Sequence, residues 1–182
     1  MIILCTFAAR KRNGIMKKNI LVIVFWLLAI GGFAQLPKVT LKDIHGKVVQ
    51  TDTLSNGGKP FIIDFFATWC KPCNRELDAI SEVYADWQAE TGVKIYVVSI
   101  DQGQDIQKVK PLVESRGWEY EVLLDPNNEF GRAMGVKFIP YVVIVDGNGK
   151  IVYKHQGYTD GEEEELFEEV KSQESRKLNI EH

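Results

Sequence analysis

The stretch "FIIDFFATWCKPCNREL", residues 61–77, places two cysteines directly after a run of β-forming residues. Phe61 to Phe66 is apolar except for Asp64, which is the pattern of a strand buried on both faces. A helix is expected from about Cys70 to Glu90, because apolar residues recur there at helical spacing and Gly92 follows. The cysteine pair is therefore expected where a buried strand meets a helix N-terminus.

The Cys-x-x-Cys spacing first raises the question of a metal. A structural zinc ion takes four ligands, and Cys70 and Cys73 supply only two of them. None of the three histidines, His45, His155 and His182, lies at a useful spacing from the pair. We therefore expect no metal site.

A purely structural disulfide is a second alternative. The two-residue gap closes a very small loop, which gives little stabilisation. With 182 residues, 45% of them hydrophobic, the chain has enough apolar surface for one domain with its own core. Both alternatives remain open, but redox chemistry is favoured.

Redox chemistry fits the expected position of the pair. Free N–H groups and the helix dipole stabilise an anion at a helix N-terminus, so the pKa of Cys70 is expected below that of an ordinary thiol. Cys73, one turn later, is placed to resolve a mixed disulfide by attacking Cys70. Pro72 suits the first helical turn. Lys71 is expected mainly as a solvent-facing side chain, which would add a little positive charge beside the site.

Two residues far from the pair support this interpretation. Asp64 interrupts an apolar strand, and its burial would raise its pKa, so it could take and return the proton of Cys73. The other interpretation of Asp64 is a core acid satisfied by hydrogen bonds. Pro140 precedes an apolar run, where it can simply mark an edge strand. A cis Ile139–Pro140 bond would present the Ile139 peptide to a bound substrate strand.

The rest of the chain alternates short strands and helices. Strands are expected in a hairpin around His45-Gly46 and at residues 94–101, 120–125, 141–145 and 151–155. Helices are expected at residues 105–117, 127–135 and 161–175, the last burying Leu166, Phe167 and Val170. Pro111 predicts a kink or a fresh helix start near Lys110. This order predicts an α/β fold whose mixed sheet has a parallel centre, an antiparallel edge and helices on both faces.

The stretch "MKKNILVIVFWLLAIGGFAQ", which begins at Met16, has the order of a secretory signal peptide. Its apolar run, residues 20–30, is short for a membrane-spanning helix, although an uncleaved N-terminal anchor is an alternative. We expect translation to start at Met16 and residues 1–34 to be an upstream extension plus signal peptide. Residues 35–182 would then form one domain in the periplasm or cell envelope.

Removal of the signal peptide would change the charge and the cysteine content. Five of the 22 basic residues precede residue 35, which leaves 17 basic against 25 acidic residues and a net charge of −8. Such a domain is a poor partner for nucleic acid or anionic membranes. Cys70 and Cys73 would be its only cysteines, and we expect a monomer.

The combination of "DFFATWCKPC" with "FIPYVVIVDGNGKIV" resembles the thioredoxin superfamily. Within it, the chain is most similar to exported TlpA/ResA-type thiol–disulfide oxidoreductases, including those common in Bacteroidetes. The resemblance spans about residues 39–170 and implies a thioredoxin-like fold, with an N-terminal hairpin and a central βα insertion at residues 108–136. It implies Cys70 as attacking thiol, Cys73 as resolving thiol, Asp64 as the buried acid and Pro140 as a cis-proline facing the pair.

The resemblance also places a substrate-binding surface beside the cysteines. It assigns this surface to Trp69, Ile139, Pro140 and Tyr141, although many members carry a threonine where this chain has Tyr141.

Two further positions depart from the family pattern. The lysine that partners the buried acid in thioredoxins corresponds to Val97, which should make Asp64 still easier to protonate. The glutamate that some cytochrome-maturation members carry after the second strand corresponds to Gln102 or Asp101.

The expected function is periplasmic thiol–disulfide exchange in the reducing direction, through the Cys70/Cys73 dithiol and without a bound cofactor. A proline before the second cysteine is usual in reducing members, which have potentials near roughly −270 mV. The expected partners are disulfide-bearing exported proteins as substrates and a membrane thiol reductant relay that reduces the oxidised pair again.

Two alternative functions remain open. One is a thiol peroxidase of peroxiredoxin type, which would need Thr68 and Arg75 at its cysteine, and the other is a non-catalytic binding module of the same fold.

Overall fold

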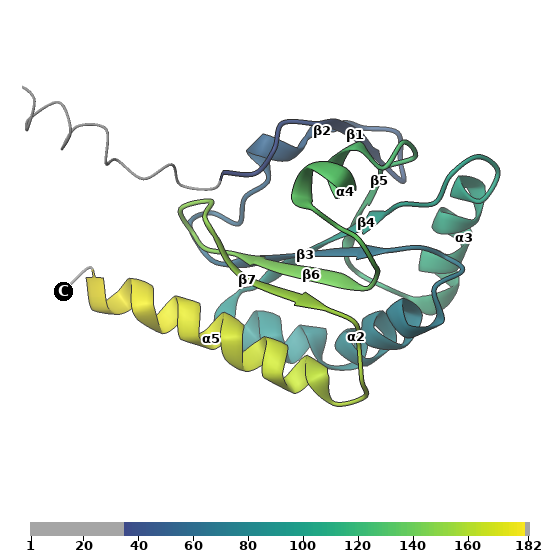
Figure 1. Cartoon of the computed structure of the whole chain (residues 1–182). Helices are drawn as coiled ribbons and strands as arrows, with labels where there is room; N and C mark the ends of the chain where they lie inside the picture. Colours follow the sequence, from purple (N-terminus) through teal and green to yellow (C-terminus); the bar gives the residue numbers. More distant parts are fainter. Residues whose placement is uncertain (1–34, 181–182) are drawn as a thin grey trace, which may run out of the picture. The chain divides into compact units, whose positions relative to one another are not determined.

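Seven strands form one sheet within residues 35–180, the part of the chain that this computed structural model describes (Figure 1). The order across the sheet is β2-β1-β5-β4-β3-β6-β7. The strands are β1 (Thr40–Asp43), β2 (Val48–Gln50), β3 (Phe61–Phe66), β4 (Lys94–Ser99), β5 (Glu121–Leu124), β6 (Tyr141–Val145) and β7 (Ile151–Gln156). The expected start at Met16 and the signal peptide lie outside the described residues.

The centre of the sheet is parallel and its outer pairs are antiparallel. β3 runs parallel to β4 and β4 runs parallel to β5, because each of these connections contains a helix. β6 pairs antiparallel with β3, and β1 pairs antiparallel with β5. The N-terminal hairpin β1–β2 therefore extends one side of the sheet, and the closing hairpin β6–β7 extends the other. The predicted mixed sheet with a parallel centre is confirmed.

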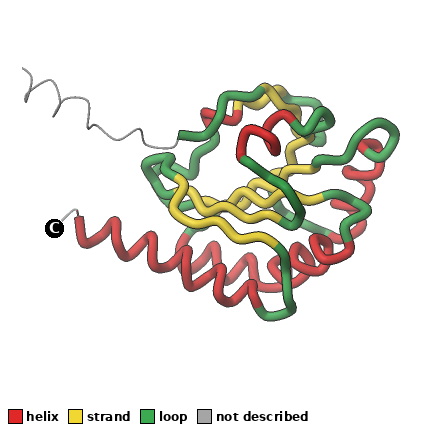
Figure 2. Tube along the Cα trace, in the orientation of Figure 1, coloured by secondary structure: helices red, strands yellow, loops and turns green. Residues whose placement is uncertain are grey.

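Helices cover both faces of the sheet, as expected (Figure 2). One face packs against residues of α2, α3 and α5, and the other packs against α4, whose Phe130 and Met134 are buried. The helices are α2 (Lys71–Thr91), α3 (Ile106–Arg116), α4 (Glu129–Met134) and α5 (Glu162–Ile180), with a short 3-10 helix η1 (Thr51–Thr53). The segment expected as a central insertion forms most of α3, then β5 and α4.

Successive side chains of β3 point to opposite faces of the sheet. Ile62 and Phe66 belong to the core beneath α2, whereas Ile63 and Phe65 belong to the core beneath α4. Asp64 lies in the same period-two row as Ile62 and Phe66, so its carboxyl group is on the α2 face. All six residues of β3 are buried, which explains the nearly unbroken apolar pattern of this segment.

The expected helix after the first cysteine is confirmed. Cys70 is the N-cap of α2, and Gly92 ends the helix in the left-handed conformation with φ 67°. On the buried side, Trp87 stacks on Phe167 of α5 with ring centroids 4.7 Å apart. Figure 1 shows α5 lying along α2. Leu166 and Val170 are buried as predicted, whereas Phe167 is only half-buried, and the backbone of α5 continues five residues past the predicted end.

The expectation of a fresh helix start near Lys110 is wrong. α3 is one helix from Ile106 to Arg116 with Pro111 inside it. Proline removes the N–H that would bond to the carbonyl of Gln107, but both residues are exposed, so water can hydrate that carbonyl. Val109 and Val113 are buried on the other side and hold both halves of the helix against the core.

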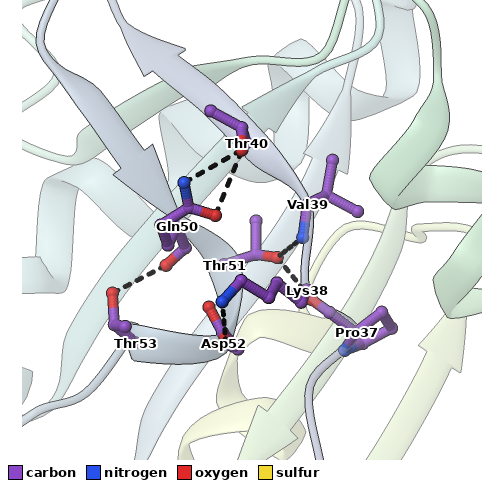
Figure 3. Close-up of polar contacts among 8 residues, drawn as sticks. All are labelled: Pro37, Lys38, Val39, Thr40, Gln50, Thr51, Asp52 and Thr53. Atoms are coloured by element: carbon purple, nitrogen blue, oxygen red, sulfur yellow. Dashed lines mark hydrogen bonds and ion pairs between the residues drawn. The ribbon is translucent and has the colours of Figure 1, made fainter.

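A buried threonine ties the N-terminal segment to the hairpin (Figure 3). The hydroxyl of Thr51 accepts a hydrogen bond from the N–H of Val39 at 2.9 Å and donates one to the carbonyl of Pro37. The Thr51 N–H also donates to the Val39 carbonyl at 3.0 Å. Across the strands, the Thr40 and Gln50 side chains bond to each other. These contacts fix the hairpin whose β1 strand pairs with β5.

Candidate active site

The two cysteines lie where the central strand β3 passes into α2. They are joined by a disulfide with 5.4 Å between their Cα atoms. Cys70 is 5% exposed and Cys73 is fully buried. Cys70 is therefore the more accessible residue of the pair, and its role as attacking thiol stays a prediction.

Helix capping explains the local geometry of the pair. The backbone N–H of Cys73 points at the Sγ of Cys70 at 3.3 Å, so the sulfur takes the place of a capping oxygen. Pro72 occupies the first turn of α2, where its missing N–H leaves no bond unmade. The side chain of Lys71 is exposed.

A buried carboxylate holds the loop that leads into the pair. Asp101, which follows β4, is fully buried and accepts hydrogen bonds from the Thr68 N–H at 2.8 Å and the Thr68 hydroxyl at 2.7 Å. It also accepts one from the Ser99 hydroxyl at 2.8 Å. Of the two positions considered for an acid after the second strand, Gln102 is exposed and Asp101 reaches the active-site loop.

Replacing Asp101 by alanine is expected to lower the free energy of unfolding by about 3 kcal/mol, because two half-buried donors of Thr68 and the buried hydroxyl of Ser99 lose their acceptor. Urea denaturation at pH 7 measures this loss. Asp105→Ala is a suitable control, since Asp105 only forms an exposed ion pair with Lys108 and is expected to change stability by less than about 0.5 kcal/mol. Equal effects of the two substitutions would contradict the anchoring role.

Asp64 is buried, as the sequence predicts. It is 1% exposed, and neither carboxyl oxygen has a hydrogen-bond partner within the described residues. Its neighbours across the sheet are Val97 on β4 and Val142 on β6. Burial among these apolar groups raises the pKa of Asp64 to about 8. The position that carries a lysine in thioredoxins is Val97 here, as expected from the resemblance. Asp64 therefore faces no positively charged side chain at this position of β4.

Glu76 is a second buried acid that the sequence analysis missed. It lies on α2 one turn after Cys73, is 4% exposed, and its Oε2 has no partner among the described residues. Burial, followed by repulsion from the charge of Asp64, raises the pKa of Glu76 to about 10. At neutral pH this carboxyl pair therefore holds at least one proton in the oxidised protein. A sequence signal existed, because Cys73, Glu76 and Ile80 follow the helical spacing of a buried face.

Exposed aromatic side chains flank the disulfide. Trp69 is 62% exposed and Phe138 is 73% exposed. Between them lies a cavity of about 270 Å³, with walls from Trp69, Phe138, Ile100, Val136 and Ile139 and polar groups from Asn128 and Lys137. A second hollow, of about 660 Å³, is lined by Thr68, Trp69 and residues of α3. The exposed Trp69 and the half-buried Ile139 both line the first cavity, and Phe138 is a further residue of its walls.

Pro140 lies at the sheet end that carries the cysteines. Phe65 is opposite Tyr141 in the β3–β6 register, so Pro140 stands beside the end of β3, and the Ile139–Pro140 bond is cis. The ring of Tyr141 is 8% exposed and packs against Phe65 at 6.2 Å between centroids. This places the Tyr141 side chain in the core beneath α4, on the opposite face from the disulfide.

The two residues that a thiol peroxidase would need, Thr68 and Arg75, interact with carboxylates in this structure. The hydroxyl of Thr68 donates to Asp101, and the guanidinium of Arg75 forms an ion pair with Asp160 at 3.2 Å. Among the described residues, no group of three or more His, Cys, Asp or Glu is placed to hold a metal ion. Within the same residues, no helix has the length and apolarity to cross a membrane.

Comparisons with known proteins agree on the chemistry of the pair. Residues 34–154 match the model of the AhpC/TSA family. The thiol–disulfide oxidoreductase ResA of Geobacillus thermodenitrificans is 31% identical over 124 residues, covering 68% of this chain and 67% of that protein. ResA of Bacillus thuringiensis subsp. konkukian is 29% identical over 133 residues, covering 73% of this chain and 74% of that protein.

Solved structures show the same fold. A thioredoxin-like protein from Porphyromonas gingivalis is 64% identical with a TM-score of 0.70, over 80% of this chain and 95% of that one. StoA from Bacillus subtilis, 21% identical with a TM-score of 0.58 over 74% of this chain and 98% of its own, shows the fold alone. The expected thioredoxin-like architecture is confirmed.

Proposed function

Because the chain belongs to the AhpC/TSA family and is a thiol–disulfide oxidoreductase, we propose that it works in the reducing direction on disulfides of exported proteins. The observation that carries this proposal is the Cys70–Cys73 pair, in which Cys70 is slightly exposed and Cys73 is fully buried on the sheet face that holds the two buried acids, Asp64 and Glu76. A buried proton reservoir serves a resolving thiol that must lose and regain a proton in every cycle.

The reaction needs two sulfur exchanges. The Cys70 thiolate attacks the substrate disulfide, so one S–S bond breaks, a mixed disulfide forms, and the first substrate sulfur leaves as a thiolate that takes a proton from water. Cys73 then gives its proton to the carboxyl pair and attacks the Cys70 sulfur, which expels the second substrate sulfur. Two electrons pass from the dithiol to the substrate, and no bound cofactor is required.

Cys70 is the group that touches the substrate. The Cys73 N–H that now points at the Cys70 sulfur would stabilise its thiolate in the reduced protein, together with the α2 dipole. Asp64 and Glu76 act through Cys73. The cavity between Trp69 and Phe138 would hold an apolar side chain next to the substrate cysteine, and the Ile139 backbone would pair with the extended substrate chain.

The proposed setting is the periplasm or cell envelope. The signal-peptide pattern that begins at Met16 supports export, and disulfides persist in such compartments. The oxidised pair would regain two electrons from a membrane thiol reductant relay. We propose that the domain acts as a monomer.

The redox potential tests the proposed direction. We expect about −270 mV, the value of a reducing thioredoxin, from equilibration of the purified protein with a dithiol–disulfide buffer. A potential above about −150 mV, close to that of DsbA, would contradict the reducing role.

The same purified protein also tests the alternative function of a thiol peroxidase. Because Thr68 and Arg75 are bonded to other acids, peroxide consumption is expected to stay at the rate of a free thiol, whereas rapid consumption would favour the rival.

A further inference from the structure

The buried proton reservoir of this site needs a route to solvent. Cys73 is fully buried and Asp64 is 1% exposed. At a pH below the pKa values of the carboxyl pair, both acids are protonated, so neither can accept the Cys73 proton until one has released its own. Each turnover then sends one proton out to water and later takes one back in.

A small cavity lies against the second acid of the pair. It has a volume of about 10 Å³, which is the space of about one water molecule. Its walls come from α2, β6, β7 and α5, and its lining residues are Glu76, Val142, Tyr153, His155, Glu162, Glu165 and Leu166. Figure 1 shows these four elements meeting where α5 runs beneath β7. A carboxyl oxygen without a partner, beside a space of this size with further polar side chains in its walls, is an arrangement in which buried water is found.

A histidine and a carboxylate, both partly exposed, lie in contact on the outer side of the cavity. The Nε2 of His155 lies 3.4 Å from the Oε2 of Glu162, and the two side chains are 36% and 34% exposed. Imidazole and carboxylate both accept and release protons. Glu76 on the inner side is 4% exposed, so the cavity separates a sealed acid from two proton carriers that reach water.

We propose that this cavity holds one water molecule and that Glu76, this water and the His155–Glu162 pair form the route by which protons pass between the buried acids and solvent. The inference rests on the proposed role of the carboxyl pair in handling the Cys73 proton. Glu76 first releases a proton to the water, which passes it to His155 or Glu162. Asp64 then gives its own proton to Glu76 and, once ionised, accepts the proton of Cys73. The reverse transfer reloads the pair, so atoms and charge balance over a cycle.

Charges on β3 and α5 act on Glu76. Asp64 on β3, and Glu162 and Glu163 on α5, raise its pKa in addition to burial. Glu165 on α5 and Tyr153 and His155 on β7 line the same cavity. The pKa of Tyr153 is itself raised, first by burial and then by Glu169, Glu165 and Glu162. Among the residues that line this cavity, the ionisable groups other than His155 are acidic or phenolic.

Hydrogen exchange of the buried acid measures the route directly. The oxidised protein, without substrate, is transferred from H₂O to D₂O at pH 6, and the infrared band of the protonated carboxyl group is followed with time. The band that Glu76→Gln removes reports on Glu76. We expect Val142→Ile, which fills the cavity without changing charge, and Glu162→Gln, which removes the outer carrier, each to slow exchange by about tenfold.

A matched control separates the route from general electrostatics. Glu163 also acts on Glu76 through its charge, but it does not line the cavity. In the variant Glu163→Gln, the exchange rate of the Glu76 proton is therefore expected to equal that of the wild type. Wild-type exchange rates in both Val142→Ile and Glu162→Gln would overturn the proposal, as would equal slowing by Glu163→Gln. The two variants are independent, so a folding failure in one leaves the other as the test. Because no disulfide is reduced, failure of the proposed function would show in the reductase assay and not here.

Discussion

Replacing Cys70 by serine is expected to reduce insulin-disulfide reduction by at least about a thousandfold, because loss of a nucleophile removes the chemical step itself. A serine hydroxyl is not ionised at neutral pH, so it cannot replace the thiolate. The fold should persist, since serine can still cap α2 by accepting the hydrogen bond that the Cys73 N–H now directs at sulfur. The rate of insulin precipitation with excess dithiothreitol measures the effect, and circular dichroism checks the fold.

The matched variant is Cys73→Ser. It keeps the attacking sulfur but lacks the resolving one, so mixed disulfides with Cys70 are expected to accumulate. Non-reducing electrophoresis of cell-envelope extracts should show these adducts for Cys73→Ser and none for Cys70→Ser. Substantial insulin reduction by Cys70→Ser would contradict the assignment of the nucleophile. Adducts absent from Cys73→Ser while Cys70 still reacts with an alkylating reagent would exclude a protein substrate.

Strong local patterns made most of the fold predictable. The apolar residues of β3, of the buried face of α2 and of the closing hairpin β6–β7 each follow the pattern of their element. The order of these elements required a sheet with a parallel centre. The sheet position of the N-terminal hairpin did not follow, because its pairing with β5 joins residues far apart in the chain. The continuity of α3 through Pro111 depended on solvent reaching the Gln107 carbonyl, which sequence does not display.

The site was predictable where one residue broke a strong pattern. Asp64 is the single charged residue in an apolar strand. The cysteines form a Cys-x-x-Cys motif, and Pro140 directly precedes an apolar strand. Glu76 does follow the spacing of the buried helix face, but its polar neighbours in sequence, Asn74, Arg75 and Asp78, are typical of an exposed turn. Only the packing of α5 and β7 over that turn buries it. The anchoring by Asp101 depends in the same way on tertiary contacts to Thr68 and Ser99.

Asp64→Asn is expected to change how the stability of the oxidised protein depends on pH. The pKa of Asp64 rises from 3.8 to about 8 on folding, so the folded state binds this proton more tightly than the unfolded chain does. The stability that the neutral acid contributes is complete below about pH 3.8 and is lost as the pH rises toward 8. Asparagine has a similar shape but cannot ionise. The variant should therefore gain about 3 kcal/mol relative to wild type between pH 5 and pH 8.

The size of that gain depends on Glu76, which shares the buried site. In the wild type the two acids repel each other when ionised, and Glu76 keeps its proton up to a pKa of about 10. Removing the Asp64 charge lowers the pKa of Glu76, so part of the pH dependence remains in Asp64→Asn and should disappear only in the double variant with Glu76→Gln. Urea denaturation at several pH values separates these contributions.

The control is Asp86→Asn, on the exposed side of α2. Its free energy of unfolding should differ from that of the wild type by less than about 0.5 kcal/mol at every pH. A constant difference between Asp64→Asn and wild type from pH 5 to pH 8 would mean that Asp64 is ionised in the folded protein, and that the carboxyl pair cannot serve Cys73 as its proton reservoir.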